Sequence, residues 1–406
     1  MTVHDVRRAS DAPVSLAPGV FRDELTERAQ RVADIAIVHA DDVDAAARFP
    51  AEAIGAAKAV KLLGVLAPRR LGGADASYGQ VADVCYTLGR ACASTAMVYA
   101  MHQVKVACIV RHGLDGNTWR QDFIRRLARD QLLLASSTTE GQNGGNVRSS
   151  EAAIERAGER ISLVRDASVI SYGESADAVV TTARRAADAA GSDQVLTVFP
   201  RDSFTLERTM GWDTLGMRGT CSAGFTLRGQ GVADQILPVP YAVIHAQSMV
   251  PAAHIFWSSA WAGIAASAVE KARRYLRKAA RGGGDMPPSA PYFTRANTSL
   301  RALRALIATT IDRYEAIADD PDELTTLEFQ SQISLLKVDA SELAVSAVMS
   351  ALRCCGLSGF RNDSDVSIGR HLRDILSSPI MINNDRILAN VAASALLTET
   401  PTSVKD

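Results

Sequence analysis

The spacing of apolar residues changes twice along this chain of 406 residues, and the change limits the folds that the chain can adopt. From Phe21 to about Arg129 apolar residues recur at the intervals of helices that are buried on one side. From about Leu132 to Val239 short β-branched runs alternate with polar turn residues, which predicts an antiparallel sheet. From about Pro251 helical spacing returns in four long segments, which predicts an up-and-down bundle.

The sequence therefore predicts an α+β protein with a helical N-terminal domain, a central antiparallel β domain and a C-terminal four-helix bundle. We expect a flexible segment over 1–20 and domains over 21–130, 131–240 and 241–400. One face of the first helix is predicted to be buried through Leu25, Ala29, Val32, Ile35 and Val38.

Charge and composition narrow the class of protein. The net charge is −1, from 44 basic and 45 acidic residues, so no single-sign field points to nucleic acid or to a membrane surface. The six cysteines lack the C-x-x-C spacing of zinc or redox sites. Since there is no apolar run of about eighteen residues and no apolar stretch in residues 1–18, we expect a cytoplasmic protein without a membrane partner.

Three polar segments are candidates for a cofactor site: Ser136–Asn146, Val169–Asp177 and Arg370–Asp374. Hydroxyls and glycines in such segments allow the backbone to approach a flat, charged cofactor. In this order, and in a chain with a strand-rich block between two helical blocks, the segments resemble those of the acyl-CoA dehydrogenase family of flavoproteins. The resemblance covers roughly Phe21 to Leu397 and implies FAD, or FMN in some relatives, in a cleft between the β domain and the bundle.

The loop that begins at Thr139 resembles the family's Thr-Glu-Pro-x-x-Gly-Ser-Asp loop, without its proline, serine and aspartate. The resemblance implies that Thr139 contacts the pyrimidine edge of the flavin. It places Gly144 and Gly145 near the pyrophosphate, with Gly145 also close to the substrate. The alternative is an ordinary Gly/Asn turn between strands.

Ser171 takes the place of a threonine that lies beside flavin N5 in the family, and Val169 takes the place of a tryptophan that stacks on the ring. A hydroxyl at this position could serve cofactor chemistry, or the segment could simply be a strand that ends in a turn. The nearby segment Gly216–Thr220 resembles the family's Gly-Met-Arg-x-Thr motif, which we interpret as a marker of the fold.

The segment Arg353–Phe360 resembles the turn that contacts the adenosine diphosphate part of FAD in a neighbouring subunit. The resemblance assigns cofactor contacts to Arg353, Gly356 and Leu357, and it implies a homo-oligomer, a dimer or a tetramer. A helix that ends at a glycine is the alternative.

The family's catalytic base has no counterpart here. The usual glutamate follows the Arg-Asp pair by eight residues, and this position is Ile382, a residue that we expect to contact substrate. A second known position corresponds to Ala253, beside His254, which is a further candidate for substrate binding. Removal of an α-proton requires a base, so the usual mechanism cannot be transferred.

Three hypotheses remain. The first is FAD-dependent dehydrogenation of an acyl thioester, on coenzyme A or on an acyl-carrier protein, with a relocated base. Asp385 is the first candidate base and His102 and His254 are the other candidates, with Asn384 and Arg386 in contact with the flavin. Asp385 could instead cap a helix.

The second hypothesis is a two-component monooxygenase that receives reduced flavin from a partner reductase and uses Ser171 and His102. The third is a relative without catalysis. The sequence favours the thioester dehydrogenase by a narrow margin.

Overall fold

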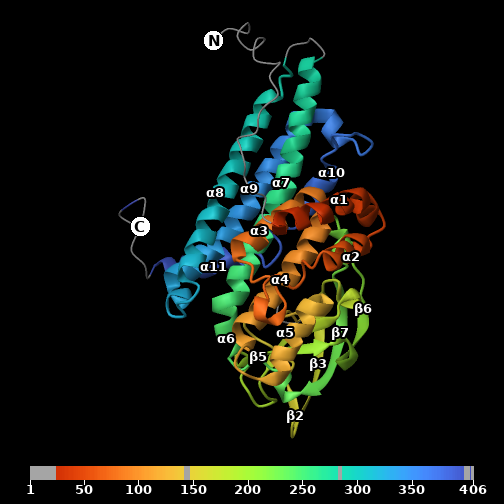
Figure 1. Cartoon of the computed structure of the whole chain (residues 1–406). Helices are drawn as coiled ribbons and strands as arrows, with labels where there is room; N and C mark the ends of the chain where they lie inside the picture. The colour runs from red at the N-terminus through yellow and green to blue at the C-terminus, as the bar shows by residue number, and fades with distance from the viewer. Residues whose placement is uncertain (1–23, 141–146, 282–285, 397–402, 404–406) are drawn as a thin grey trace.

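The computed structural model describes residues 24–140, 147–281, 286–396 and 403. The segment expected to be flexible, 1–20, lies outside the described residues. Along the described chain, helices come first, strands follow and helices return (Figure 1). The long helices of the bundle extend from one end of the molecule, the strands form the other end, and the first helices lie against the region where the two meet (Figure 1). The predicted fold class is confirmed.

The N-terminal helices surround a buried central helix. They are α1 (Glu24–Ala45), α2 (Ala51–Ala59), α3 (Tyr78–Ala91), α4 (Ala93–Gly113) and α5 (Thr118–Asp130). α3 starts at a capping box, in which Ser77 and Gln80 satisfy each other's backbone N–H groups. α4 is apolar on almost all sides, as expected of a helix that other elements enclose.

The buried face of α1 differs from the prediction. Val38 is 74% exposed and Ile35 is 38% exposed, whereas Ala36 and Ala40 are buried. Leu25, Ala29 and Val32 are buried as predicted, so the prediction is wrong only for Ile35 and Val38. Beyond Val32 the buried positions of α1 include Ala36, Ala40 and Val43.

The β domain consists of two small sheets. The first has the order β1 (Leu134–Ser137), β4 (Ala178–Arg184) and β5 (Gln194–Pro200); the second has the order β2 (Glu155–Ala157), β3 (Arg160–Ile170), β7 (Ala223–Val232) and β6 (Phe204–Met210). The named strands pair antiparallel except β1 and β4, which are parallel. The sheets pack closely, since a Cβ on Gly229 would lie 2.8 Å from the ring of Phe199.

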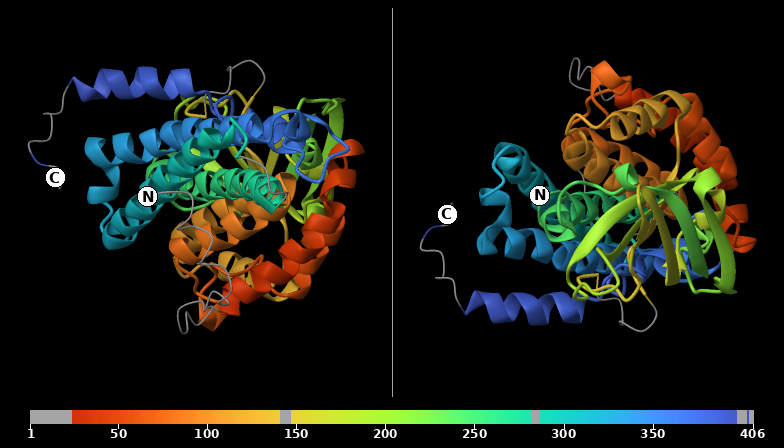
Figure 2. Two further views of the ribbon diagram at one scale, coloured as in Figure 1. Left: turned by 90° about the horizontal axis from the view of Figure 1, so that it is seen from above. Right: turned by 90° about the horizontal axis from the view of Figure 1, so that it is seen from below.

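The C-terminal region begins with α6 (Tyr241–Ile244) and a π-helical turn (His245–Met249) that runs into α7 (Val250–Arg281). It continues with α8 (Ala290–Ile317), α9 (Leu327–Phe360), α10 (Gly369–Ile375) and α11 (Asn384–Ala395). Instead of a fourth long helix, two short ones follow α9, and α11 projects beyond the bundle in both views of Figure 2. Ile382 and Asn383, between α10 and α11, have left-handed backbone conformations with φ of 60° and 59°.

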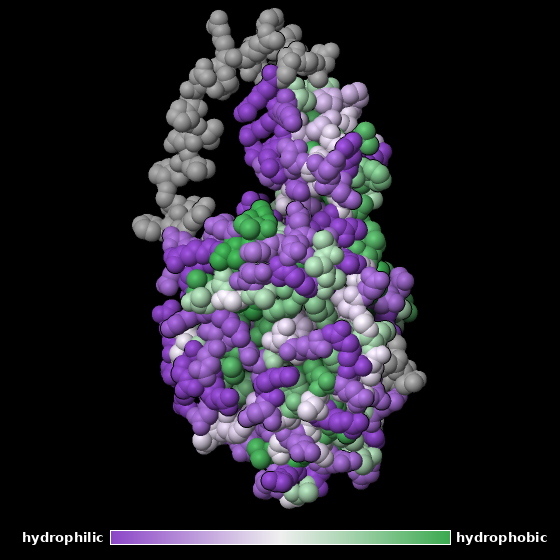
Figure 3. All heavy atoms as spheres, turned by 90° about the vertical axis from the view of Figure 1, so that its right-hand side faces the viewer, coloured by the Kyte–Doolittle hydropathy of each residue, from purple (hydrophilic) through white to green (hydrophobic). Residues whose placement is uncertain are grey.

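By length and composition alone, α9 is apolar enough to cross a membrane. It packs against both α7 and α8, however, and a core helix has the same composition. On the face in Figure 3, hydrophobic residues lie in small groups among hydrophilic ones. The apolar character of α9 is thus explained by its place in the bundle.

Candidate functional site

A cavity of about 570 Å³ lies where the N-terminal helices, the β domain and the C-terminal helices meet. Its walls come from α4, from the ends of β1 and β3, from the loop before β7, from α7 and from the chain between α10 and α11. The residues that line it include Met97, Met101, Thr139, Val169, Ser171, Trp212, Gly216, Met217, Thr220, Ser222, Trp257, Arg373 and Ile382. Most of this surface is apolar, and the hydroxyl groups lie mainly on the β-domain side.

Ser171 is fixed at the end of β3 by the residue that follows it. Tyr172 has a left-handed backbone (φ 43°), is fully buried, and donates from its hydroxyl to the carbonyl of Leu134 at 3.0 Å. Its backbone N–H donates to the carbonyl of Thr220 at 2.8 Å. A buried aromatic anchor therefore holds the Ser171 hydroxyl at the cavity wall.

Three hydroxyls form a chain that ends on a carbonyl. Ser171 Oγ lies 2.7 Å from Ser222 Oγ, and Ser222 Oγ lies 2.8 Å from Thr220 Oγ1. Thr220 donates to the carbonyl of Met217 at 2.9 Å. Since each hydroxyl has one proton, all three bonds form only if Ser222 donates to Thr220 and Ser171 donates to Ser222. Because its proton is used in this chain, Ser171 Oγ can take part in a further hydrogen bond only as an acceptor.

The loop that carries Met217 is held tightly against α10. A Cβ on Gly216 would lie 2.0 Å from the carbonyl oxygen of Arg373, so only glycine permits this approach. Arg373 donates to both carboxylate oxygens of Asp44 and to the carbonyl of Leu215. These contacts give Arg373 a structural role at the cavity wall.

A smaller hollow of about 90 Å³ adjoins the cavity and shares Met101, Trp257 and Ile382 with it. His254 lines this hollow and is bonded through Nδ1 to the carbonyl of Ile333 at 2.8 Å. Burial lowers the pKa of His254 to about 4, and Lys337 lowers it further while the Ile333 carbonyl opposes the shift. Neutral His254 therefore offers an unprotonated Nε2 as an acceptor.

His102 does not reach either hollow, so the catalytic role considered for it is corrected. It is fully buried; its Nε2 lies 2.8 Å from the carbonyl of Leu63, and its Nδ1 accepts from the backbone N–H of Leu134 at 3.0 Å. Burial lowers the pKa of His102 to about 4. Both ring nitrogens serve the backbone, and we assign this residue a structural role.

Asn384, Asp385 and Arg386, which follow soon after Ile382, do not line either hollow. Asp385 is exposed and lies at the start of α11, and Arg386 follows it, so neither is among the residues that line the hollows. Asn384 is buried, accepts from Lys337 Nζ at 2.6 Å and donates to Ser341 Oγ at 3.0 Å. The geometry gives no support to Asp385 as a base or to Asn384 as a flavin contact within one chain.

The segment expected to meet a neighbouring subunit lies on the surface. Arg353 stacks on the ring of Tyr292 at 4.0 Å, and Leu357 is 73% exposed. Between them Gly356 interrupts α9 with φ 55° and ψ −136°. Their contact with FAD stays a prediction. Gly144 and Gly145 lie outside the described residues.

The sequence analysis does not predict several of the residues that line the cavity and the smaller hollow. Thr220 ends a segment interpreted only as a marker of the fold, and neither Ser222 nor Trp257 is predicted to contribute to a site. Lys105 and His245, which line the smaller hollow, carry no motif. A lysine inside the apolar run of α4 is the one signal that could have drawn attention to that hollow.

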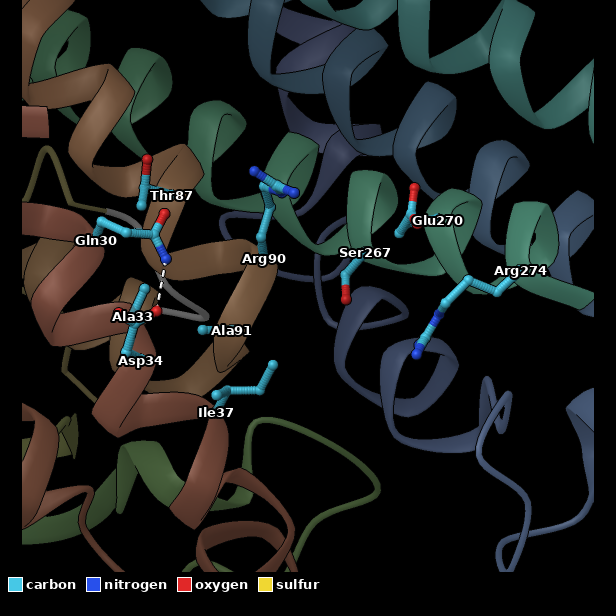
Figure 4. A pocket seen from close by; sticks show the side chains of 10 residues that line it. All are labelled: Gln30, Ala33, Asp34, Ile37, Thr87, Arg90, Ala91, Ser267, Glu270 and Arg274. Atoms are coloured by element: carbon cyan, nitrogen blue, oxygen red, sulfur yellow. Dashed lines mark hydrogen bonds between the residues drawn. The ribbon is translucent and has the colours of Figure 1, made fainter. Parts of the chain in front are cut away.

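Another hollow, of about 330 Å³, lies between α1, α3 and α7 (Figure 4). Arg90 and Arg274 line it together with Asp34 and Glu270, and Asp34 accepts a hydrogen bond from Gln30. Its charges are of both signs, and it shares no residue with the cavity at Ser171. We do not include it in the candidate site.

Family models match both helical regions: the N-terminal domain of acyl-CoA dehydrogenases over residues 22–131 and their C-terminal domain over residues 248–397. The chain belongs to the acyl-CoA dehydrogenase family, as its motifs predict. A curated relative, cyclohex-1-ene-1-carbonyl-CoA dehydrogenase of Geobacter metallireducens, is 24% identical over 359 residues, which are 88% of this chain and 92% of the relative.

Solved structures share the fold over nearly the whole chain. FMN-bound TdsC from Paenibacillus sp. A11-2 has a TM-score of 0.81 at 18% identity and covers 94% of this chain and 99% of its own. The nitrososynthase from Micromonospora carbonacea var. africana has a TM-score of 0.78 at 21% identity and covers 91% of this chain and 95% of its own. At these identities the likeness concerns the fold alone.

Proposed function

We propose that this protein is a flavin-dependent monooxygenase of the two-component kind, which receives reduced flavin from a separate reductase and transfers oxygen from O2 to an organic substrate. One observation carries the proposal: among the described residues that line the cavity and the adjoining hollow, none is aspartate or glutamate. The loop over 141–146, Gly-Gln-Asn-Gly-Gly-Asn, has no acidic residue in its sequence either. Dehydrogenation of a thioester needs a base at this place.

The carboxylates of Glu140 and Asp374, which are close in sequence to cavity residues, already accept hydrogen bonds from other groups. Glu140, which follows Thr139, accepts from two backbone N–H groups and forms an ion pair with buried Arg165 at 3.3 Å. Asp374, which follows Arg373, accepts from the backbone N–H of Met217 at 2.7 Å. Neither side chain lines the cavity, so neither is placed to take a substrate proton.

The cavity suits the ring system of a flavin, which is flat, largely apolar and polar along one edge. Trp212 and Met97 supply apolar walls, and Thr139 and Ser171 supply hydroxyls on the β-domain side. A reduced flavin, when bound, supplies the electrons that activate O2. In the hydroxyl chain, Ser171 Oγ is an acceptor, which favours the N5–H of reduced flavin over the lone pair of oxidised N5.

The relatives are consistent with either chemistry. TdsC is a dibenzothiophene monooxygenase, and the curated relative is a cyclohex-1-ene-1-carbonyl-CoA dehydrogenase. Because fold does not determine activity, the choice depends on the cavity. FMN and FAD are both candidates, since the adenosine contacts expected of Arg353 depend on a neighbouring subunit.

Anaerobic titration with reduced and oxidised FMN and FAD tests the proposal. We expect reduced flavin to bind at least about tenfold more tightly than oxidised flavin, the ratio that about one hydrogen bond provides. Ser171→Ala and Ser222→Ala should lower that ratio, because each breaks the hydroxyl chain. Ser299→Ala, which changes an exposed hydroxyl on α8, is the control and should leave the ratio unchanged.

The same preparation decides against the proposal if it carries tightly bound oxidised FAD that acyl-CoA thioesters bleach in the absence of oxygen. That result would establish the dehydrogenase and would require a base outside the walls described here.

A further inference from the structure

We propose that the smaller hollow binds a carboxylate of the substrate through Lys105, so that the substrate is an organic acid whose apolar body extends into the larger cavity. The proposal rests on the proposed function only in assigning the larger cavity to flavin and to the reacting part of the substrate. Nothing in the motifs of the sequence points to this residue.

Lys105 lies on the face of α4 that forms the cavity wall. Met97, Met101 and Lys105 follow one another at intervals of four residues, which places them on one side of the helix. The first two line the larger cavity, and Met101 and Lys105 line the smaller hollow. Lys105 is 3% exposed, so its ammonium group is removed from bulk water.

The ammonium group of Lys105 lacks the partner that a buried charge requires. Its one hydrogen bond among the described residues goes to the sulfur of Met249, at 3.0 Å. A thioether is a weak acceptor and carries no charge. Burial lowers the pKa of Lys105 to about 8, so the side chain still holds its proton at neutral pH. A buried cation of this kind is costly unless an anion joins it.

The surroundings of Lys105 supply no negative charge. The π-helical turn at the start of α7 directs His245 and Met249 into the hollow. The pKa of His245 is lowered to about 3, first by burial and then by Arg148, His254 and Lys105, so this side chain is neutral at neutral pH. No carboxylate lines the described part of this hollow to balance the charge of Lys105. That unbalanced charge favours an anion.

A further unsatisfied donor lies in the wall between the two hollows. The indole Nε1–H of Trp257 is buried and has no hydrogen-bond partner among the described residues. Turns of π-helix occur frequently at functional sites, and this one carries two of the lining residues. Unsatisfied polar groups and an irregular turn in one place are typical of a binding site rather than of a packed core.

The size of the hollow limits what can occupy it. About 90 Å³ has room for a small group such as a carboxylate but not for coenzyme A. Most of the exposed lining is apolar and includes Val104 and Val250, and an apolar lining limits the screening of the charge by water. Ser136, Thr138 and Tyr241 also line the hollow. Met101 lines both this hollow and the larger cavity, where the body of the acid would lie.

Binding of matched acids and amides tests the proposal without turnover. The probes are formate, acetate, benzoate, phenylacetate and 3-phenylpropionate, each paired with its amide, and added to flavin-loaded protein under anaerobic conditions. Calorimetry and the flavin difference spectrum measure the affinities. We expect at least one acid to bind about tenfold or more tightly than its amide, the ratio that a hydrogen bond to a charged group supplies.

Lys105→Met keeps the length of the side chain and removes its charge, and we expect it to abolish the preference for the acid. Its melting temperature should be unchanged or higher, which guards against misfolding, because it removes an unpaired buried cation. Lys278→Met, on the exposed part of α7, is the control and should keep the preference.

The proposal is overturned if no acid is preferred over its amide, or if the preference persists in Lys105→Met. Failure of the proposed function would appear separately, as tight binding of oxidised FAD and bleaching by thioesters. The first failure is a loss of the difference between acid and amide, and the second is reduction of the flavin by a thioester, so the two failures are distinguishable.

Discussion

Asp374 lies beneath the loop that forms one wall of the cavity, and it is 4% exposed. Its pKa is raised from 3.8 to about 6, first by burial and also by the charge of Asp44, while the hydrogen bond from Met217 and the two nearby arginines oppose the rise. A carboxyl group whose pKa is higher in the folded protein than in the unfolded chain stabilises the folded protein at pH values below the unfolded pKa. That contribution is lost as pH rises through about 6.

We therefore expect Asp374→Asn to become more stable relative to the wild type as pH rises from 4 to 8. The amide oxygen still accepts from the N–H of Met217, and there is no longer a buried carboxylate to ionise. The full difference is at most about 3 kcal/mol, at 1.36 kcal/mol for each pKa unit. Urea denaturation of both proteins across this pH range measures it. An equal loss of stability in the variant at every pH would contradict the argument.

The residues also show how far sequence reasoning reaches into the site. Ser171 is predicted because its segment resembles the family's segment beside flavin N5, and the structure places it at the cavity wall. Lys105 is not predicted, because the run of α4 around it is typical of a core helix. The partners of Ser171 could not be predicted either, since Ser222 is separated from it by 51 residues. His102 is misassigned because sequence does not reveal which backbone groups a histidine satisfies.

At the scale of elements, the crossing of α3 and α7 depends on two glycines. A Cβ on Gly89 would lie 2.3 Å from the carbonyl oxygen of Ala260, and a Cβ on Gly263 would lie 2.3 Å from the carbonyl oxygen of Tyr86. Both contacts are with backbone, which cannot rotate away as a side chain can. The crossing joins the N-terminal helices to the bundle and fixes α7, which carries Trp257 into the cavity.

Gly89→Ala should consequently destabilise the protein by about 1–3 kcal/mol or more, as overpacking does, although alanine favours helix. Gly55→Ala is the matched control, because Gly55 lies within α2 and a Cβ there meets nothing within 4 Å. That substitution should stabilise by up to about 1 kcal/mol. Chemical denaturation compares the two, and similar effects of the same sign would refute the close crossing.

The period of the apolar residues predicts the order of the elements. It does not predict all of the boundaries of these elements or all of the elements that they pair with. The final helix of the predicted bundle is replaced by α10 and α11. The turns between them include Ile382 and Asn383 in left-handed conformations, which no sequence pattern predicts for a β-branched residue. The parallel pairing of β1 with β4 is also unexpected, since the residues between them cross to the second sheet and return. Tertiary packing decides these features.

At the scale of the whole molecule, the cavity belongs to no single part of the chain. Met101 comes from the N-terminal helices, Ser171 from the β domain, and Trp257 and Ile382 from the C-terminal helices. The sequence predicts each of these parts, yet it does not predict which faces converge. An ion pair between Lys58 of α2 and Asp177 before β4, at 2.6 Å, connects the first two parts further.

A ligand that fills such a cavity contacts all three parts, and it should therefore stabilise them together. Under anaerobic conditions, reduced FMN or FAD at a hundred times its Kd should add about 2.7 kcal/mol of stability. Differential scanning calorimetry should then show one transition that moves upward as a whole, by more with reduced than with oxidised flavin. If the parts were energetically independent, the flavin would shift one of several transitions and leave the others in place. In that case cofactor binding would not stabilise the arrangement of the three parts around Ser171. The preference for reduced flavin would then have to come from contacts within the β domain alone.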